Sequence, residues 1–139
     1  MTKAALIPVF ALVLLALFTG VALGLSRSGA IRRREVRMKD VALGGADLWP
    51  ERVRKIAASY ANQLEMPVLF YVLVALALPL ERADGVFIAL EWVYVVLRYA
   101  HAYIHMSDNV VPRRFLAFAG SAVTLLVLWV YFALRVLLA

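Results

Sequence analysis

Six polar side chains lie inside segments that are otherwise long and apolar. They form two groups, Asn62 with Glu65, and then Glu91, Arg98, His101 and His105. A charged residue at the centre of a bilayer costs roughly 2.5–3.5 kcal/mol on insertion scales, and the charges that persist usually face a bundle interior or a pathway. Such groups can pair with one another or bind a polar ligand. They are the first candidates for a functional site.

The spacing of these residues places each group on one face of a helix. Asn62 and Glu65 are three residues apart, and the second group advances in steps of seven, three and four. We count 1.5 Å per residue from the side of the membrane where most lysines and arginines lie. By this count Glu65 and Arg98 are both roughly 12–13 Å deep. Asn62 lies level with His101 by the same count. We therefore expect the two faces to oppose each other.

Two interpretations of this arrangement stay open. In the first, Glu65 and Arg98 form a buried ion pair that fixes helix register, and Asn62 bonds between helices. In the second, these residues line a polar pocket that opens to the side of the membrane with the basic loop, assigned below as cytoplasmic, and binds an anionic or partly lipophilic ligand. The residues expected near its mouth favour the pocket: they are Tyr99, Tyr103, Arg113, Arg114 and the cluster 32–34. No third ligand is evident beside His101 and His105, so a metal site is not predicted.

Membrane-spanning helices must position these residues. The chain has 139 residues, of which 65% are hydrophobic, whereas soluble proteins are about 45–50% apolar. Four apolar stretches are long enough to cross a core of ~30 Å, and Pro67 should kink the second. The prediction is one all-α integral membrane domain over residues 1–139, a four-transmembrane-helix bundle with spans at about 4–25, 56–80, 85–106 and 115–138. The absence of cysteine excludes disulfides and thiolate metal sites.

Positive charge gathers on one side of this topology. The loop of residues 26–55 holds nine lysines and arginines, and the loop after the third span adds Arg113 and Arg114. The other side holds only Lys3, Arg82 and Arg135. The positive-inside rule then makes the basic loop cytoplasmic and places both termini outside. These basic residues also account for the pI of about 10.1. Their position indicates that they fix the topology and contact anionic lipids, so no nucleic-acid partner is predicted. The composition suits a bacterial inner membrane.

Two motifs resemble a known family. The pattern Asn-x-x-Glu at residues 62–65, followed by Pro67, resembles the second helix of the MAPEG proteins (membrane-associated proteins in eicosanoid and glutathione metabolism). The pattern Arg-Tyr-x-x-x-Tyr at residues 98–103, followed by Asn109 and Arg113, is similar to that family's third-helix region. The resemblance covers most of the chain. It implies a bacterial-type member that is a left-handed four-helix bundle, assembled as a homotrimer with active sites between subunits.

The resemblance also implies a chemistry. Catalytic members bind glutathione as a co-substrate and lower its thiol pKa with an arginine, because the thiolate is the nucleophile. The thiolate then attacks a lipophilic electrophile or reduces a lipid hydroperoxide. When the family's roles are carried over by position, the arginine that activates the thiol is Arg113, Arg114 or Arg32. Substrate binding falls to Asn62, Glu65, Arg33, Tyr99 and Tyr103. The polar pocket argued from depth and helical spacing adds Arg98 and His101, and Arg54 is added as a substitute for an arginine that this chain lacks.

The chain also departs from the catalytic pattern. Catalytic members place an arginine four residues before the asparagine, where this chain has Ala58, and Arg54 lies one turn earlier on the same face. Loss of a charge-assisted contact would weaken glutathione binding. A non-catalytic member that binds lipid or another membrane protein is therefore the alternative. A proton-coupled multidrug transporter is disfavoured because the first span has no carboxylate.

Overall fold

The structure is a computed structural model that describes residues 2–138, and over these residues it contains helices and no strand. Four helical segments in this part of the chain are long and apolar enough to cross a membrane. They are Lys3–Arg32, Glu51–Ala77, Gly85–Met106 and Val111–Leu137. The predicted all-α membrane bundle is confirmed.

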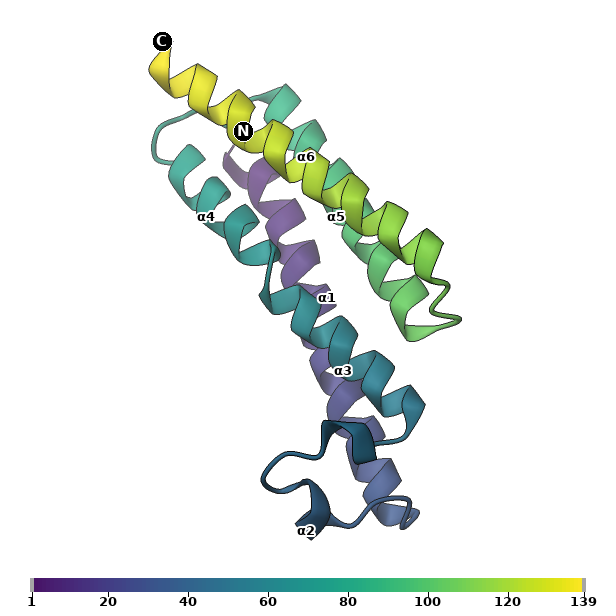
Figure 1. Ribbon diagram of the computed structural model, residues 1–139. Helices are drawn as coiled ribbons and strands as arrows, with labels where there is room; N and C mark the ends of the chain where they lie inside the picture. The colour runs from purple at the N-terminus through teal and green to yellow at the C-terminus, as the bar shows by residue number, and fades with distance from the viewer. Residues whose placement is uncertain (1, 139) are drawn as a thin grey trace.

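The chain folds into an elongated bundle whose two ends differ (Figure 1). Its elements are α1 (Thr2–Arg32), α2 (Met38–Val41), a 3-10 turn η1 (Ala46–Leu48), α3 (Glu51–Leu64), α4 (Pro67–Ala77), α5 (Gly85–Met106) and α6 (Val111–Leu137). Both termini lie at one end, and the loop that contains α2 lies at the other. At the loop end, α1 and α3 project past the hairpin of α5 and α6.

The first helix is longer than the predicted span. The expected boundary was residue 25, but α1 continues to Arg32. No proline interrupts residues 26–32, and the one glycine there, Gly29, costs only about 1 kcal/mol relative to alanine. The helix ends where Arg34 adopts a left-handed φ of 58° and the Glu35 amide donates to the carbonyl of Ala30. The start of the basic loop is therefore helical.

The second span is broken, as Pro67 predicts. Because proline has no amide hydrogen and collides with the preceding turn, α3 ends at Leu64 and α4 begins at Pro67. Between them, Glu65 has a non-helical backbone with φ −93° and ψ −99°. The carbonyl of Asn62 lies just before this break, and it accepts a hydrogen bond from the side chain of Arg98 at 2.6 Å. The break therefore provides a backbone acceptor for α5.

Apolar packing joins the four long segments in the half of the bundle near the termini. Phe70 of α4 and Tyr94 of α5 are fully buried and stacked, with ring centroids 4.9 Å apart. Leu12, Phe87 and Leu128 bring α1, α5 and α6 into the same core. Outward-facing positions on these helices are largely apolar and exposed, as expected for surfaces that meet lipid or another subunit.

The turn before α5 is fixed by Asp84. Its Oδ1 accepts from the Phe87 amide at 3.0 Å, capping α5, while Oδ2 accepts from the Tyr131 hydroxyl at 2.6 Å and lies 3.0 Å from Arg135. These contacts, chiefly the bond from Tyr131 and then the Phe87 amide, lower the pKa of this carboxyl. The α4–α5 turn is thus tied to the end of α6.

We expect the stability of this end of the bundle to fall in acid. A carboxyl whose pKa is lower in the folded state stabilises it above its unfolded pKa of about 3.9, and this contribution disappears as the pH drops through the lower folded value. The thermal midpoint of the wild type in detergent should therefore fall more steeply below about pH 4 than that of Asp84→Asn, which keeps the cap but cannot titrate. Parallel pH profiles for the two proteins would contradict this assignment.

Candidate functional site

One face of α5 gathers buried polar side chains, as the spacing predicted. Glu91, Arg98, His101 and His105 are all buried within the single chain, and Tyr94 joins them on the same face. Sequence reasoning missed Tyr94, although its position three residues after Glu91 was a signal. We call these five residues the buried polar stripe. It faces the α3–α4 segment at Arg98, which contacts the backbone of Asn62. The expected opposition of the two polar faces is therefore found at Asn62 and not at Glu65.

Arg98 occupies the middle of the buried polar stripe and is fully buried. Its Nη2 donates to the Asn62 carbonyl at 2.6 Å and lies 3.4 Å from Oε1 of Gln63. The ion pair with Glu65, which was one of the two interpretations of the sequence, is not present among residues 2–138, and Glu65 is exposed. The physical reason is the break at Pro67, because the non-helical backbone at Glu65 takes it off the face that α3 presents to α5.

A pocket of about 240 Å³ lies where the buried polar stripe reaches the loop end of the bundle. Its polar lining consists of Asn62 from α3, His101 and His105 from α5, and Arg114 from the first turn of α6. The Arg114 guanidinium is held by a 2.6 Å hydrogen bond to Oδ1 of Asn109. The two imidazole rings lie 5.5 Å apart. Three of the predicted site residues, Asn62, His101 and Arg114, thus line one pocket.

This pocket combines cationic and neutral donors with apolar walls. Val111, Phe115 and Phe118 complete the lining, and the Phe118 ring lies 5.8 Å from that of His101. Such a lining suits an anionic group attached to an apolar or extended ligand. Within residues 2–138 no group of three or more potential metal ligands comes together.

The two predicted tyrosines lie at a different place. Tyr99 and Tyr103 line an apolar pocket of about 400 Å³ between α1 and α5, together with Leu15 and Phe18. The Tyr99 hydroxyl donates to the Ala11 carbonyl at 2.7 Å, and Tyr103 is 75% exposed. This second pocket offers an apolar ligand a wall of aromatic and aliphatic side chains.

Arg54 and Ala58 line a third pocket, of about 320 Å³, between the end of α1 and the start of α3. Here the guanidinium of Arg27 lies over the ring of Trp49, 5.3 Å from its centroid. Arg27 was expected in a loop, and it comes to this pocket because α1 continues past residue 25. Arg54 therefore does not join the pocket that contains Asn62.

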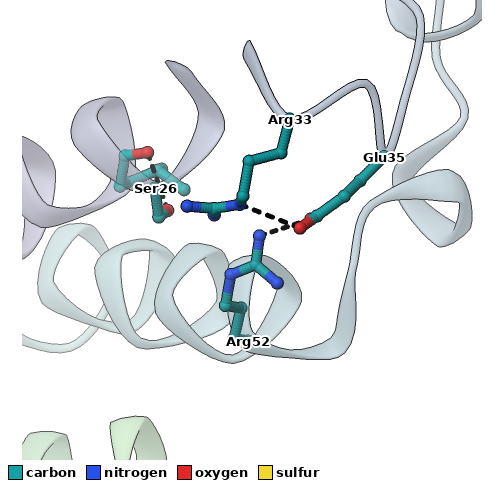
Figure 2. A network of polar contacts seen from close by, with 5 residues as sticks. Ser26, Arg33, Glu35 and Arg52 are labelled. Carbon is teal, nitrogen blue, oxygen red and sulfur yellow. Dashed lines mark hydrogen bonds and ion pairs between the residues drawn. The ribbon is translucent and has the colours of Figure 1, made fainter. Parts of the chain in front are cut away.

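The remaining predicted arginines lie on the surface. Figure 2 shows Arg33 and Arg52 converging on Glu35, which ties the end of α1 to the start of α3. The bond from Arg52, and next that from Arg33, lowers the pKa of the Glu35 carboxyl. Arg32 is exposed, and Arg113 is exposed with its Nη1 3.8 Å from Asp108. In the single chain, none of the three predicted arginines Arg32, Arg33 and Arg113 lines the pocket of Asn62.

The comparisons with known proteins give one family. The sequence model described as MAPEG family matches residues 5–134, which is nearly the whole chain. No curated protein and no solved structure matches the chain.

Proposed function

Since the chain belongs to the MAPEG family, we propose that it is a membrane-bound transferase or peroxidase that uses glutathione or another thiol. The electrophile or hydroperoxide is lipophilic, and an arginine stabilises the thiolate. The single observation that supports this best is the pocket shared by Asn62, His101, His105 and Arg114 at the loop end of the bundle. It provides a fixed cation and an amide beside apolar walls.

Arg114 is the arginine that we assign to the thiolate. Of the three that the sequence offered, it alone lines the pocket with Asn62, whereas Arg113 and Arg32 are exposed. The hydrogen bond to Asn109 holds its guanidinium in place before a ligand arrives. A preorganised cation of this kind favours the anionic thiolate over the neutral thiol.

The proposed site is completed by neighbouring copies in a homotrimer. The pocket volume of about 240 Å³ lies below the roughly 300–1,000 Å³ typical of small-molecule sites. Long rows of exposed apolar side chains on α1 and α6 leave room for subunit contacts within the membrane. A second subunit would then bring Arg32 or Arg33, at its own α1 terminus, towards the thiol ligand. The apolar pocket of Tyr99 and Tyr103 would take the lipophilic substrate.

The proposed location is a bacterial inner membrane, with the basic loop cytoplasmic and both termini outside. Two features support this orientation. The termini lie together at the end of the bundle opposite α2. The exposed arginines of residues 32–37 lie at the loop end, where the positive-inside rule places the cytoplasm.

A second candidate is a non-catalytic member that binds lipid or another membrane protein. Ala58 favours it, because it stands where catalytic members have an arginine and Arg54 lines a different pocket from Asn62. A spectroscopic titration separates the two candidates. Glutathione added to the purified protein should produce the ultraviolet absorbance of a thiolate near neutral pH, followed by conjugation of a generic aryl halide. Absence of both signals would eliminate the enzyme.

Glu65→Gln tests the ligand-binding part of the proposal. Glu65 is exposed and forms no ion pair within residues 2–138, so its neutralisation should leave the thermal midpoint unchanged. Glu65 does not line the pocket of Asn62 in the single chain, so in the proposal it meets the ligand across the boundary between subunits. Glutathione affinity should then fall by about 10-fold or more, because charge-assisted hydrogen bonds are the strong ones. Isothermal titration and thermal unfolding of the same preparation measure both quantities. A lowered midpoint with unchanged affinity would instead assign Glu65 a structural role.

A further inference from the structure

The pocket between the end of α1 and the start of α3 has no part in the proposed thiol chemistry. Its volume is about 320 Å³, and its charged lining consists of Arg27, Arg54 and Asp47. The rest of its wall is apolar and is formed by Ala46, Trp49, Val53, Ala57 and Ala58. A cavity of this size, with a few charged groups on an apolar wall, is typical of a site for a small ligand or a headgroup.

The two arginines of this pocket keep their charge available to a ligand. Neither forms an ion pair with a carboxylate among residues 2–138, whereas the neighbouring Arg33 and Arg52 are both paired with Glu35. The Arg27 guanidinium is also held in place, 5.3 Å from the ring centroid of Trp49. A planar guanidinium matches the oxygens of a phosphate group. The pocket therefore offers two arginines to a phosphate.

The position of the pocket in the membrane indicates the source of that phosphate. Arg27 follows the uncharged segment of residues 4–25 by only two positions. On α3, Lys55 follows Arg54 directly, and its Nζ lies 3.5 Å from the carbonyl of Ser107, the residue after α5. The helices thus leave the hydrocarbon core near this level, and the headgroup layer adds roughly 5–7 Å beyond it. The pocket, with Trp49 in its wall, lies where phospholipid headgroups and interfacial tryptophans lie.

Small residues leave room for an acyl chain between this pocket and the hydrocarbon core. On α1, Gly24 lies one turn before Arg27, and a Cβ built at Gly24 would meet no neighbouring atom within 4 Å. On α3, Ala58 lines the pocket, and Ala61 is exposed three residues further along the same face. These two helices contact each other and run side by side here (Figure 1). A chain attached to the phosphate can follow this surface into the bilayer.

The charges of the pocket narrow the choice of headgroup. The two arginines and Asp47 leave one positive charge in excess, which a single phosphodiester neutralises, and the carboxylate calls for a hydrogen-bond donor. We propose that the pocket binds a phospholipid, with its phosphate at Arg27 and Arg54 and an ammonium or hydroxyl group of its headgroup at Asp47. Ethanolamine and glycerol headgroups provide such a donor, and choline does not. The pocket is separate from that of Asn62, so the inference does not require the proposed thiol chemistry.

Native mass spectrometry of the full-length protein in detergent tests the proposal. Phospholipids with identical acyl chains and ethanolamine, glycerol or choline headgroups are titrated, and the fraction of protein that carries one lipid is measured. The ethanolamine and glycerol lipids should bind several-fold more tightly than the choline lipid. The double variant Arg27→Gln, Arg54→Gln should weaken their binding by about 10-fold or more, because charge-assisted contacts are the strong ones. Asp47→Ala should instead remove the preference over choline.

Arg34→Gln is the matched control. Arg34 is an exposed arginine at the same end of the bundle, forms no ion pair among residues 2–138 and does not line this pocket, so this variant should bind lipid as the wild type does. Equal binding by the double variant and this control would overturn the proposal, and so would equal affinity for the three headgroups. Displacement of the lipid by inorganic phosphate or glutathione would also overturn it, because the site would then belong to a soluble anion. The thiolate titration uses none of these variants and remains an independent test of the proposed function.

Discussion

Arg114→Ala should lower thiol turnover by about 100- to 1,000-fold, the loss found when one preorganised donor to a developing anion is removed. Arg114 lines the pocket of Asn62 and His101, and its guanidinium is held by Asn109 at 2.6 Å. Without that cation the thiol would ionise near its ordinary pKa of about 8.5. Turnover of the variant should therefore recover as the pH rises towards this value, and this recovery distinguishes thiolate stabilisation from a merely structural role.

Arg113→Ala is the matched control for this prediction. It removes the same group one residue earlier, from a side chain that is exposed and only loosely paired with Asp108. Its turnover should stay within about 2-fold of the wild type, as expected for an exposed ion pair of little energetic value. Steady-state kinetics over a range of pH would measure both variants. An equal loss in the two variants, or a loss in Arg114→Ala that does not change with pH, would refute the assignment.

The sequence predicts the buried face of α5 well because its polar residues differ sharply from their apolar surroundings and recur with the period of a helix. In a chain this apolar, residues such as Glu91 and Arg98 stand out, and their spacing allows only one face of a helix. Counting residues from the basic side also placed Asn62 level with His101, and the two residues share a pocket. Tyr94 escaped notice because an aromatic residue in a span does not signal polarity, although its hydroxyl is buried with the stripe.

The sequence predicts less well where a local break changes the phase of a helix. Helical spacing alone puts Asn62 and Glu65 on one face, but the proline after them ends the helix, so Glu65 is exposed while Arg98 bonds to a backbone carbonyl. Hydropathy likewise ended the first span at residue 25. Hydropathy measures preference for lipid rather than helical conformation, so it could not show that α1 continues to Arg32.

Phe70→Ala should destabilise the bundle by about 3 kcal/mol, at the lower end of the range for truncating a buried phenylalanine. Phe70 is fully buried in the first turn of α4 and stacks on Tyr94 with an interplanar angle of 16°. Within a bilayer the hydrophobic effect adds little to helix association, so the loss arises mainly from the cavity and the missing ring contact. Reversible unfolding in mixed micelles measures this change.

Leu69→Ala tests whether that loss belongs to the core. Leu69 precedes Phe70 on α4 but is 51% exposed on the outer face, so its truncation leaves no internal cavity and should cost less than about 1 kcal/mol. Equal costs for the two variants would contradict the packing of α4 against α5. Phe70 contacts the stripe through Tyr94, so its truncation should also loosen that phenol. The break at Pro67 thus positions two contacts on α5, because the carbonyl before it binds Arg98 and the ring after it supports Tyr94.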